Sequence, residues 1–142
     1  MLTQVADKLL EELSDPSADF VVVVEGKKDV EALRRLGILR VEMLNHYPSV
    51  VDMADALAEK GIKRAVILTD YDRTGKALAY KLGAALMSAG IHVDWKARAK
   101  IRREFHVTYI ENLDRIVEAM ERGEKNGKNI YRLGKVSHSR KH

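Results

Sequence analysis

Strand-like and helix-like patterns alternate along most of the chain. Four apolar runs predict short strands, at 20–24, 38–44, 64–69 and 91–95. Three stretches with apolar positions three and four residues apart predict helices closed by glycine, over 28–36, 50–60 and 73–89. Strands that alternate with helices of this length are typical of an α/β fold with a parallel sheet and helices on both faces. The four valines of the first run agree, because a strand of this kind is buried on both sides.

Helical patterns also flank this core. Leu2, Leu9 and Leu13 belong to an apolar stripe at helical spacing, which predicts an N-terminal helix lying on the sheet. The basic stretch WKARAKIRREF is either a helix or a loop, and we favour the helix. Thr108 and Glu111 form a capping box for a last helix that Gly123 closes. The predicted organisation is an N-terminal helix in 1–18, a core over 19–95, a helical extension over 96–122 and a basic, flexible tail over 123–142.

Composition narrows the class of protein. The chain has 142 residues, enough for one domain with a real core, and its lack of cysteine excludes disulfides, zinc thiolates and a thiol nucleophile. We expect a cytoplasmic protein, because neither a signal peptide nor a membrane span is recognisable. The net charge of +4 is concentrated in two blocks: residues 95–103 carry five basic and no acidic side chains, and residues 123–142 carry six against one. These blocks suggest a nucleic acid as partner, RNA or DNA, although a solvated face and a basic tail would look the same.

The candidate chemistry lies where two of the apolar runs stop. FVVVVEG ends on Glu25, and AVILTDYDRTG ends on Asp70 and Asp72. In an extended backbone these two aspartates share one face, about 6–7 Å apart at Cβ. Adjacent parallel strands would bring all three acids to one edge of the sheet, where open α/β folds bind ligands. Three carboxylates at such an edge suit a hard cation, Mg²⁺ or Mn²⁺, with Glu25 as a third ligand or a proton-transfer group.

Structural roles compete with these functional ones. Asp72 is also a suitable N-cap for the helix that follows it, and a single D-x-D motif is more often structural than catalytic. Lys27 and Lys28 open a helix beside Glu25, and Arg73 adjoins the D-x-D motif, so each is a candidate phosphate contact.

Two further sets of side chains are weighed in the same way. Asn45 and His46 follow the second strand at the same edge as the acids, where they could contact substrate or simply form a turn. Trp95, at the end of the fourth predicted strand, is a candidate base-stacking residue but is more typical of a core position.

The two motifs VVVVEGKKD and VILTDYDRTG resemble the signatures of the Toprim domain, which topoisomerases, bacterial primases, old-type nucleases and the ribonuclease that matures 5S ribosomal RNA share. The resemblance spans roughly 20–95, so the chain looks most like the small stand-alone Toprim proteins. It implies a Rossmann-like fold with a four-stranded parallel sheet. It also implies that Glu25 is a metal ligand and general acid or base, and that Asp70 and Asp72 bind Mg²⁺. Gly26 and Gly75 would let the backbone approach substrate phosphate.

Departures from that family narrow the function. Lys76 stands where topoisomerases usually carry a glutamate, and no tyrosine has the context of a topoisomerase nucleophile. Metal-dependent phosphodiester hydrolysis remains, with a non-catalytic nucleic-acid-binding accessory protein as the alternative. DYDRT also fits the D-x-D-x-T of haloacid-dehalogenase-like phosphatases, in which Asp70 would be the nucleophile. That motif normally follows the first strand, whereas here it follows the third, and the phosphatase reading leaves Glu25 unexplained.

Overall fold

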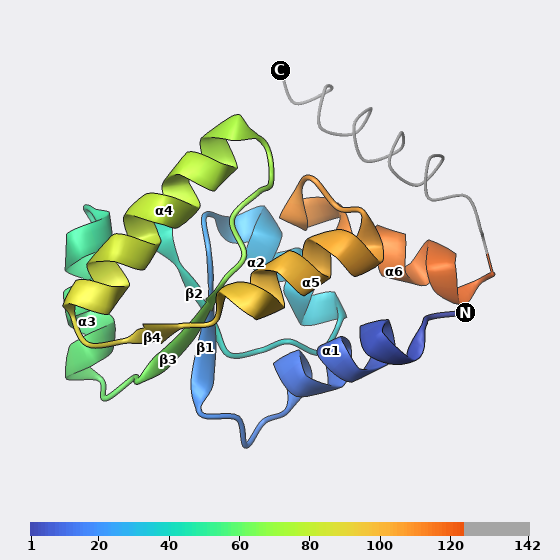
Figure 1. The fold of residues 1–142 in the computed structure, drawn as a ribbon, viewed down its shortest axis with the longest axis horizontal. Helices are drawn as coiled ribbons and strands as arrows, with labels where there is room; N and C mark the ends of the chain where they lie inside the picture. The colour runs from blue at the N-terminus through green and yellow to red at the C-terminus, as the bar shows by residue number, and fades with distance from the viewer. Residues whose placement is uncertain (124–142) are drawn as a thin grey trace.

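A four-stranded parallel sheet forms the centre of the computed structural model, which describes residues 1–123 (Figure 1). Its strands are β1 (Phe20–Val24), β2 (Val41–Met43), β3 (Arg64–Ile67) and β4 (His92–Val93), in the order β2-β1-β3-β4. The register pairs Val22 of β1 with Val41 on one side and Val66 on the other. The predicted α/β class with a four-stranded parallel sheet is therefore confirmed.

Helices cover both faces of this sheet. They are α1 (Gln4–Ser14), α2 (Lys27–Arg35), α3 (Val50–Glu59), α4 (Arg73–Ser88), α5 (Trp95–Phe105) and α6 (Leu113–Glu121), with short 3₁₀ turns η1 (Leu44–His46) and η2 (Ile110–Asn112). In Figure 1, α3 and α4 lie on one side of the sheet, and α1, α2, α5 and α6 lie on the other. The N- and C-terminal helices therefore thicken one side of the sheet only.

The valines of β1 explain how one strand serves two cores. Val22 and Val24 are fully buried among side chains of α1, α5 and α6, while Val21 and Val23 are buried among those of α3 and α4. Alternation along a strand sends successive side chains to opposite faces, so an unbroken valine run fills both. β1 is thus held in the middle of the domain, and the residues that follow it emerge at the edge of the sheet.

Several boundaries differ from the predicted ones. β2 begins only at Val41, later than the predicted start at 38. β4 ends at Val93, and Trp95 begins α5 because the Asp94 carboxylate accepts the Ala97 N–H at 3.0 Å as a helix cap. The last helix begins later than a cap at Thr108 predicts: the 3₁₀ turn η2 comes first, and α6 starts at Leu113 without a side-chain cap.

The basic stretch after the sheet forms α5, as predicted, and its Ile101 and Phe105 are buried in the core. No helix within residues 1–123 is both long and apolar enough to cross a membrane. Beyond Gly123, the predicted basic tail lies outside the part of the chain that the structure describes.

Candidate functional site

The two strands that end on acidic residues are direct neighbours. β1 and β3 pair in parallel with Val23 opposite Ile67, and the Leu68 N–H donates to the Val23 carbonyl at 2.8 Å just beyond the ladder. Glu25 follows β1 immediately, and Asp70 follows β3 after two further buried residues. The carboxyl ends of both strands therefore carry acids to one edge of the sheet, as the sequence predicts.

Glu25 and Asn45 lie side by side at this edge. The Asn45 N–H donates to the Glu25 carbonyl at 3.0 Å, and a Cβ added to Gly26 would lie 3.2 Å from Asn45 Nδ2. The Glu25 side chain is exposed and makes no hydrogen bond or ion pair with any described residue. Its carboxylate is therefore available to a ligand, on the residue whose backbone carbonyl accepts the Asn45 N–H.

Neighbouring candidates surround this pair. His46, at the end of η1, is exposed, and so is Lys27, the first residue of α2. Gly26 caps α2, and its N–H donates to Asp29 Oδ2 at 3.2 Å. The edge thus presents one carboxylate, one amide and a lysine at the start of a helix, a mixture suited to a phosphate or a hydrated cation.

Asp72 is the N-cap of α4. Its Oδ1 accepts the Gly75 N–H at 2.7 Å, which is the structural role that competes with metal binding for this residue. Arg73 is the first residue of the helix and is exposed. The cap uses one carboxylate oxygen, so Asp72 keeps a second oxygen that could meet a cation.

Asp70 is held by the C-terminal part of the chain. Its Oδ1 accepts the Ile110 N–H at 2.8 Å, and the next residue, Tyr71, donates its own N–H to the Thr108 carbonyl at 2.7 Å. Both partners lie in the segment between α5 and α6. The helical extension is therefore part of the candidate site, because it sets the conformation of the D-x-D loop.

Arg98, on α5, forms the base of the D-x-D loop. Its Nη1 donates to the Thr69 carbonyl at 2.7 Å and, more weakly, to the Ile67 carbonyl at 3.3 Å, and its Nη2 donates to the Asp70 carbonyl at 3.0 Å. A guanidinium carries its donors in a rigid fork, which lets one side chain bind several carbonyl oxygens at a strand end.

Arg98 and Tyr71 also hold each other. The guanidinium carbon of Arg98 lies 4.3 Å from the Tyr71 ring centre, and the Tyr71 hydroxyl donates to the Arg98 carbonyl at 2.7 Å. Burial lowers the pKa of Arg98 and raises the pKa of Tyr71, so both side chains belong to the interior. Sequence reasoning missed this arginine, because it counted the residue with the basic surface of 95–103.

Gly75 is required by packing within the loop. A Cβ at this position would lie 2.1 Å from the Asp70 carbonyl oxygen, and the Thr69 hydroxyl donates to the Gly75 carbonyl at 2.8 Å. The first turn of α4 therefore rests directly on the backbone of the acidic loop. This contact accounts for the glycine without a substrate, so its proposed approach to phosphate stays a prediction.

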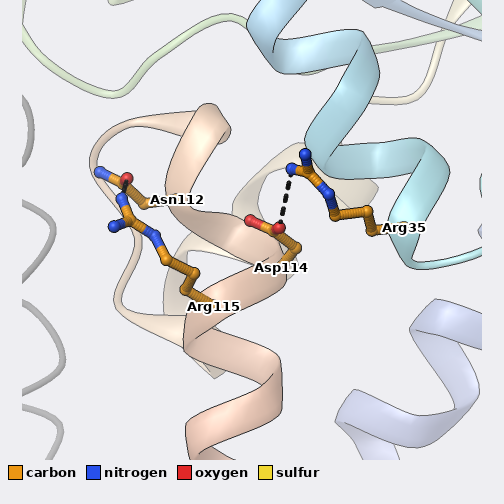
Figure 2. Close-up of polar contacts among 4 residues, drawn as sticks. All are labelled: Arg35, Asn112, Asp114 and Arg115. Atoms are coloured by element: carbon orange, nitrogen blue, oxygen red, sulfur yellow. Dashed lines mark hydrogen bonds and ion pairs between the residues drawn. The ribbon is translucent and has the colours of Figure 1, made fainter.

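An ion pair links α2 to α6. Arg35 Nη1 lies 3.2 Å from Asp114 Oδ2, and Arg115 donates to the Asn112 side chain, as Figure 2 shows. The ion pair connects the helix that follows Glu25 with α6, whereas the Arg115–Asn112 hydrogen bond lies within the C-terminal segment itself. These contacts therefore help to set the position of the C-terminal segment against the edge of the sheet.

The carboxylates of Glu25, Asp70 and Asp72 are suitable ligands for a hard cation, but they do not enclose one. Within residues 1–123, no three histidine, cysteine or acidic side chains are gathered closely enough to hold a metal ion. Glu25, Asp70 and Asp72 thus reach the same edge without forming a closed three-carboxylate cage. Mg²⁺ typically keeps several waters and takes one or two protein carboxylates plus phosphate oxygens, so these residues fit a cation whose shell a substrate completes.

Comparisons with known proteins agree with this geometry. The profile of the Toprim domain matches residues 20–108. The chain is 34% identical over 94 residues to the UPF0292 protein MJ1624 of Methanocaldococcus jannaschii, which covers 66% of this chain and 73% of that protein. It is 39% identical over 97 residues to the UPF0292 protein Mbar_A0484 of Methanosarcina barkeri, covering 68% and 67%. A solved structure of a protein from Aquifex aeolicus superposes with a TM-score of 0.67 at 28% identity, over 77% of this chain and 98% of that one.

Proposed function

This chain belongs to the Toprim domain family, among the UPF0292 proteins, and we propose that it is a Mg²⁺-dependent nucleic-acid-processing protein that hydrolyses phosphodiester bonds. One observation carries the proposal: β1 and β3 are parallel neighbours, so the exposed Glu25 and the D-x-D loop share an edge of the sheet. Asp70 and Asp72 also have structural contacts, but the exposed Glu25 has none among the described residues. A site that binds a cation together with a phosphate explains an exposed carboxylate at this edge.

The proposed metal site is open and completed by substrate. Glu25 and Asp72 are the first candidates for ligands, because Glu25 has no partner among the described residues and the cap uses a single oxygen of Asp72. Asp70, whose Oδ1 accepts the Ile110 N–H, is the third proposed ligand. When bound, Mg²⁺ or Mn²⁺ would neutralise charge on the phosphodiester and orient it for attack.

The chain's own residues supply the remaining functions. In hydrolysis a water oxygen bonds to phosphorus, a P–O bond breaks, and a proton leaves the water while another reaches the departing oxygen. We assign the proton acceptor to Glu25, whose carboxylate is exposed. Lys27, Arg73 and the Asn45 amide are assigned to the phosphate backbone, since all three are exposed in segments that follow β1, β3 and β2 at the same edge of the sheet.

The partner is proposed to be RNA or DNA, recognised mainly through phosphates. Lys96, Lys100 and Arg103 of α5 are exposed and give this helix a basic outer surface. Arg98 is excluded from that surface because it is buried under the D-x-D loop. The basic surface within 95–103 is therefore smaller than the sequence count suggests, and residues 123–142 would have to supply a large share of the electrostatic attraction.

Cleavage assays test the proposal directly. The protein is incubated with structured RNA, single-stranded DNA and duplex DNA, with Mg²⁺, with Mn²⁺ or with a chelator. Glu25→Gln should abolish metal-dependent cleavage, whereas the matched variant Glu59→Gln, at the end of α3, should retain it. Equal cleavage by both variants would overturn the assignment of Glu25.

A second function, a non-catalytic accessory protein that binds nucleic acid, has one observation in its favour. The carboxylates are not gathered into a closed metal-binding group, and each aspartate has an oxygen engaged by a backbone N–H. Binding without cleavage, unchanged by Glu25→Gln, would favour this alternative. Turnover of small phosphate monoesters through a trapped phospho-Asp70 would instead point to a phosphatase.

A further inference from the structure

An apolar groove runs between α4 and α5, beside the candidate site. It has a volume of about 810 Å³, and its walls include Lys76, Tyr80, Gly83, Met87 and Trp95. Its Lys76 end lies in the first turn of α4, where the Lys76 N–H donates to the Asp72 carbonyl at 2.9 Å. The groove therefore begins one turn of α4 after Asp72, and Arg98, which lines it, also binds the carbonyls of Thr69 and Asp70 in the D-x-D loop.

Two aromatic rings lie exposed along this groove. Tyr80 is 78% exposed and Trp95 39%, and their ring centres are 6.3 Å apart with the planes tilted by 38°. The Trp95 ring is seated on bare helix backbone, because a Cβ at Gly83 would lie 2.4 Å from Trp95 Cζ2. A glycine inside a helix is unfavourable by itself, so its presence here is explained by the seat that it provides for the ring.

The charged side chains that line the groove are basic. No acidic residue is among those that line it, whereas Lys76 lines it and Arg73 lies one turn before Lys76 on α4. Residues 73, 76 and 80 are three and four apart, so these two cations and the Tyr80 ring follow one another along one face of the helix. Aromatic platforms next to cations are the combination that proteins use for unpaired nucleotides.

We propose that this groove binds a single-stranded nucleic-acid segment, with its bases stacked on Tyr80 and Trp95 and its phosphates near Lys76 and Arg73. The inference rests on the proposed function and extends it, because it sets the path by which a strand leaves the site. It also selects the substrate class: the bases of a duplex are stacked on each other and cannot reach these rings, whereas those of a single strand can.

Trp95 is the single tryptophan of the chain, so its fluorescence reports on the groove alone. The full chain is titrated in Mg²⁺-free buffer with oligothymidylate and oligouridylate, and with a duplex of equal length. We expect both single strands to quench Trp95 and the duplex to leave it unchanged. Tyr80→Ala should weaken single-strand binding about 5- to 100-fold, since stacking on one aromatic ring contributes that much, and Tyr80→Phe should restore it.

Controls separate this groove from general electrostatics. Val51→Ala, at an exposed apolar position on α3, should bind as the wild type does. Wild-type affinity in Tyr80→Ala, or quenching by duplex as strong as by single strand, would overturn the inference. So would a dimer in sedimentation experiments that Tyr80→Ala dissociates, since a second copy of the chain would then be the occupant.

The outcome is distinguishable from a failure of the proposed hydrolysis. If Tyr80-dependent quenching is observed but no metal supports cleavage, the groove binds single strands and the proposed hydrolysis is wrong. If the wild type cleaves while Trp95 does not respond to single strands, the groove inference falls and the catalytic assignment stands.

Discussion

Replacing Arg98 by methionine tests whether the D-x-D loop is held from beneath. Methionine keeps much of the length and the apolar contact with Tyr71 but has no donors. The two shorter hydrogen bonds, to Thr69 at 2.7 Å and to Asp70 at 3.0 Å, would be lost from a position where the side chain is buried. An unsatisfied buried acceptor costs about 1–3 kcal/mol, so two of them cost roughly 2–6 kcal/mol.

Relief of the buried cation offsets part of that loss, because removing a charge from the interior is favourable by itself. We therefore expect Arg98→Met to lower the free energy of unfolding by about 2–4 kcal/mol, within the total of about 5–15 kcal/mol that a domain possesses. Arg98→Lys should fall in between, since an ammonium lacks the planar fork.

Urea denaturation of the three proteins measures this effect. Arg103→Met is the control, because that arginine lies on the same helix with its side chain exposed and pairs with Glu104 at 3.5 Å. Its loss should change the stability by less than about 1 kcal/mol. A stability of Arg98→Met within about 0.5 kcal/mol of the wild type would refute the argument. If the variant is folded but cleaves more slowly at saturating metal, Arg98 is a positioning residue for the acidic loop.

Three further predictions follow from the same contacts. Gly75→Ala should destabilise the protein by about 2–4 kcal/mol, because the added Cβ would collide with the Asp70 backbone. In the same denaturation assay Gly61→Ala should cost about 1 kcal/mol, because that site has open space but a φ of 83°; equal losses in the two variants would contradict this. Burial raises the pKa of Tyr71, so its contribution to stability is full below the unfolded-state pKa of about 10 and declines as the pH rises further. The stability difference between the wild type and Tyr71→Phe should accordingly be about 0.5–1.5 kcal/mol at pH 7 and shrink above pH 10, and a constant difference in pH-dependent denaturation would refute it. Removing residues 124–142 should flatten the salt dependence of nucleic-acid affinity without changing the unfolding midpoint of the core; an unchanged salt slope would exclude the tail from the binding surface.

Local patterns of apolar residues were sufficient to predict the main strands and helices of the fold. The valine run of β1 and the apolar run of β3 predicted two buried strands, and the short connections between strands and helices made a parallel sheet the only simple arrangement. Because the carboxyl ends of parallel strands lie at one edge of a sheet, the sequence positions of Glu25 and the D-x-D loop predicted that both lie at that edge. The parallel pairing of β1 with β3 confirms that the two strands are neighbours, whereas the roles of these acids stay a prediction.

Contacts made by α5 and the turn after it were not predictable in the same way. Arg98 lies in a run of basic residues, and periodicity gives no reason to place one of them in the interior. Its carbonyl partners are 28 to 31 residues away in sequence, and Ile110 is 40 residues from Asp70. Such hydrogen bonds form only when α5 packs against the end of the sheet, so no local sequence pattern predicts them.

Trp95 is the opposite case to Arg98: its sequence pattern predicted a core position, but the ring is partly exposed. The apolar pattern placed it at the end of a strand, but the Asp94 cap starts a helix there and turns the ring out onto Gly83. The half-exposed ring becomes visible as a binding surface only when α4 and α5 lie next to each other.

Titration of Mn²⁺ into ¹⁵N-labelled protein, followed through the broadening of backbone amide signals, shows whether a metal ion binds where β1 and β3 end. The signals of Glu25, Gly26, Asn45 and Arg73 should broaden first, Mg²⁺ should reverse the effect, and Glu25→Gln should weaken it. Broadening that begins instead near Asp114, or that Mg²⁺ does not reverse, would rule out a metal site at this edge.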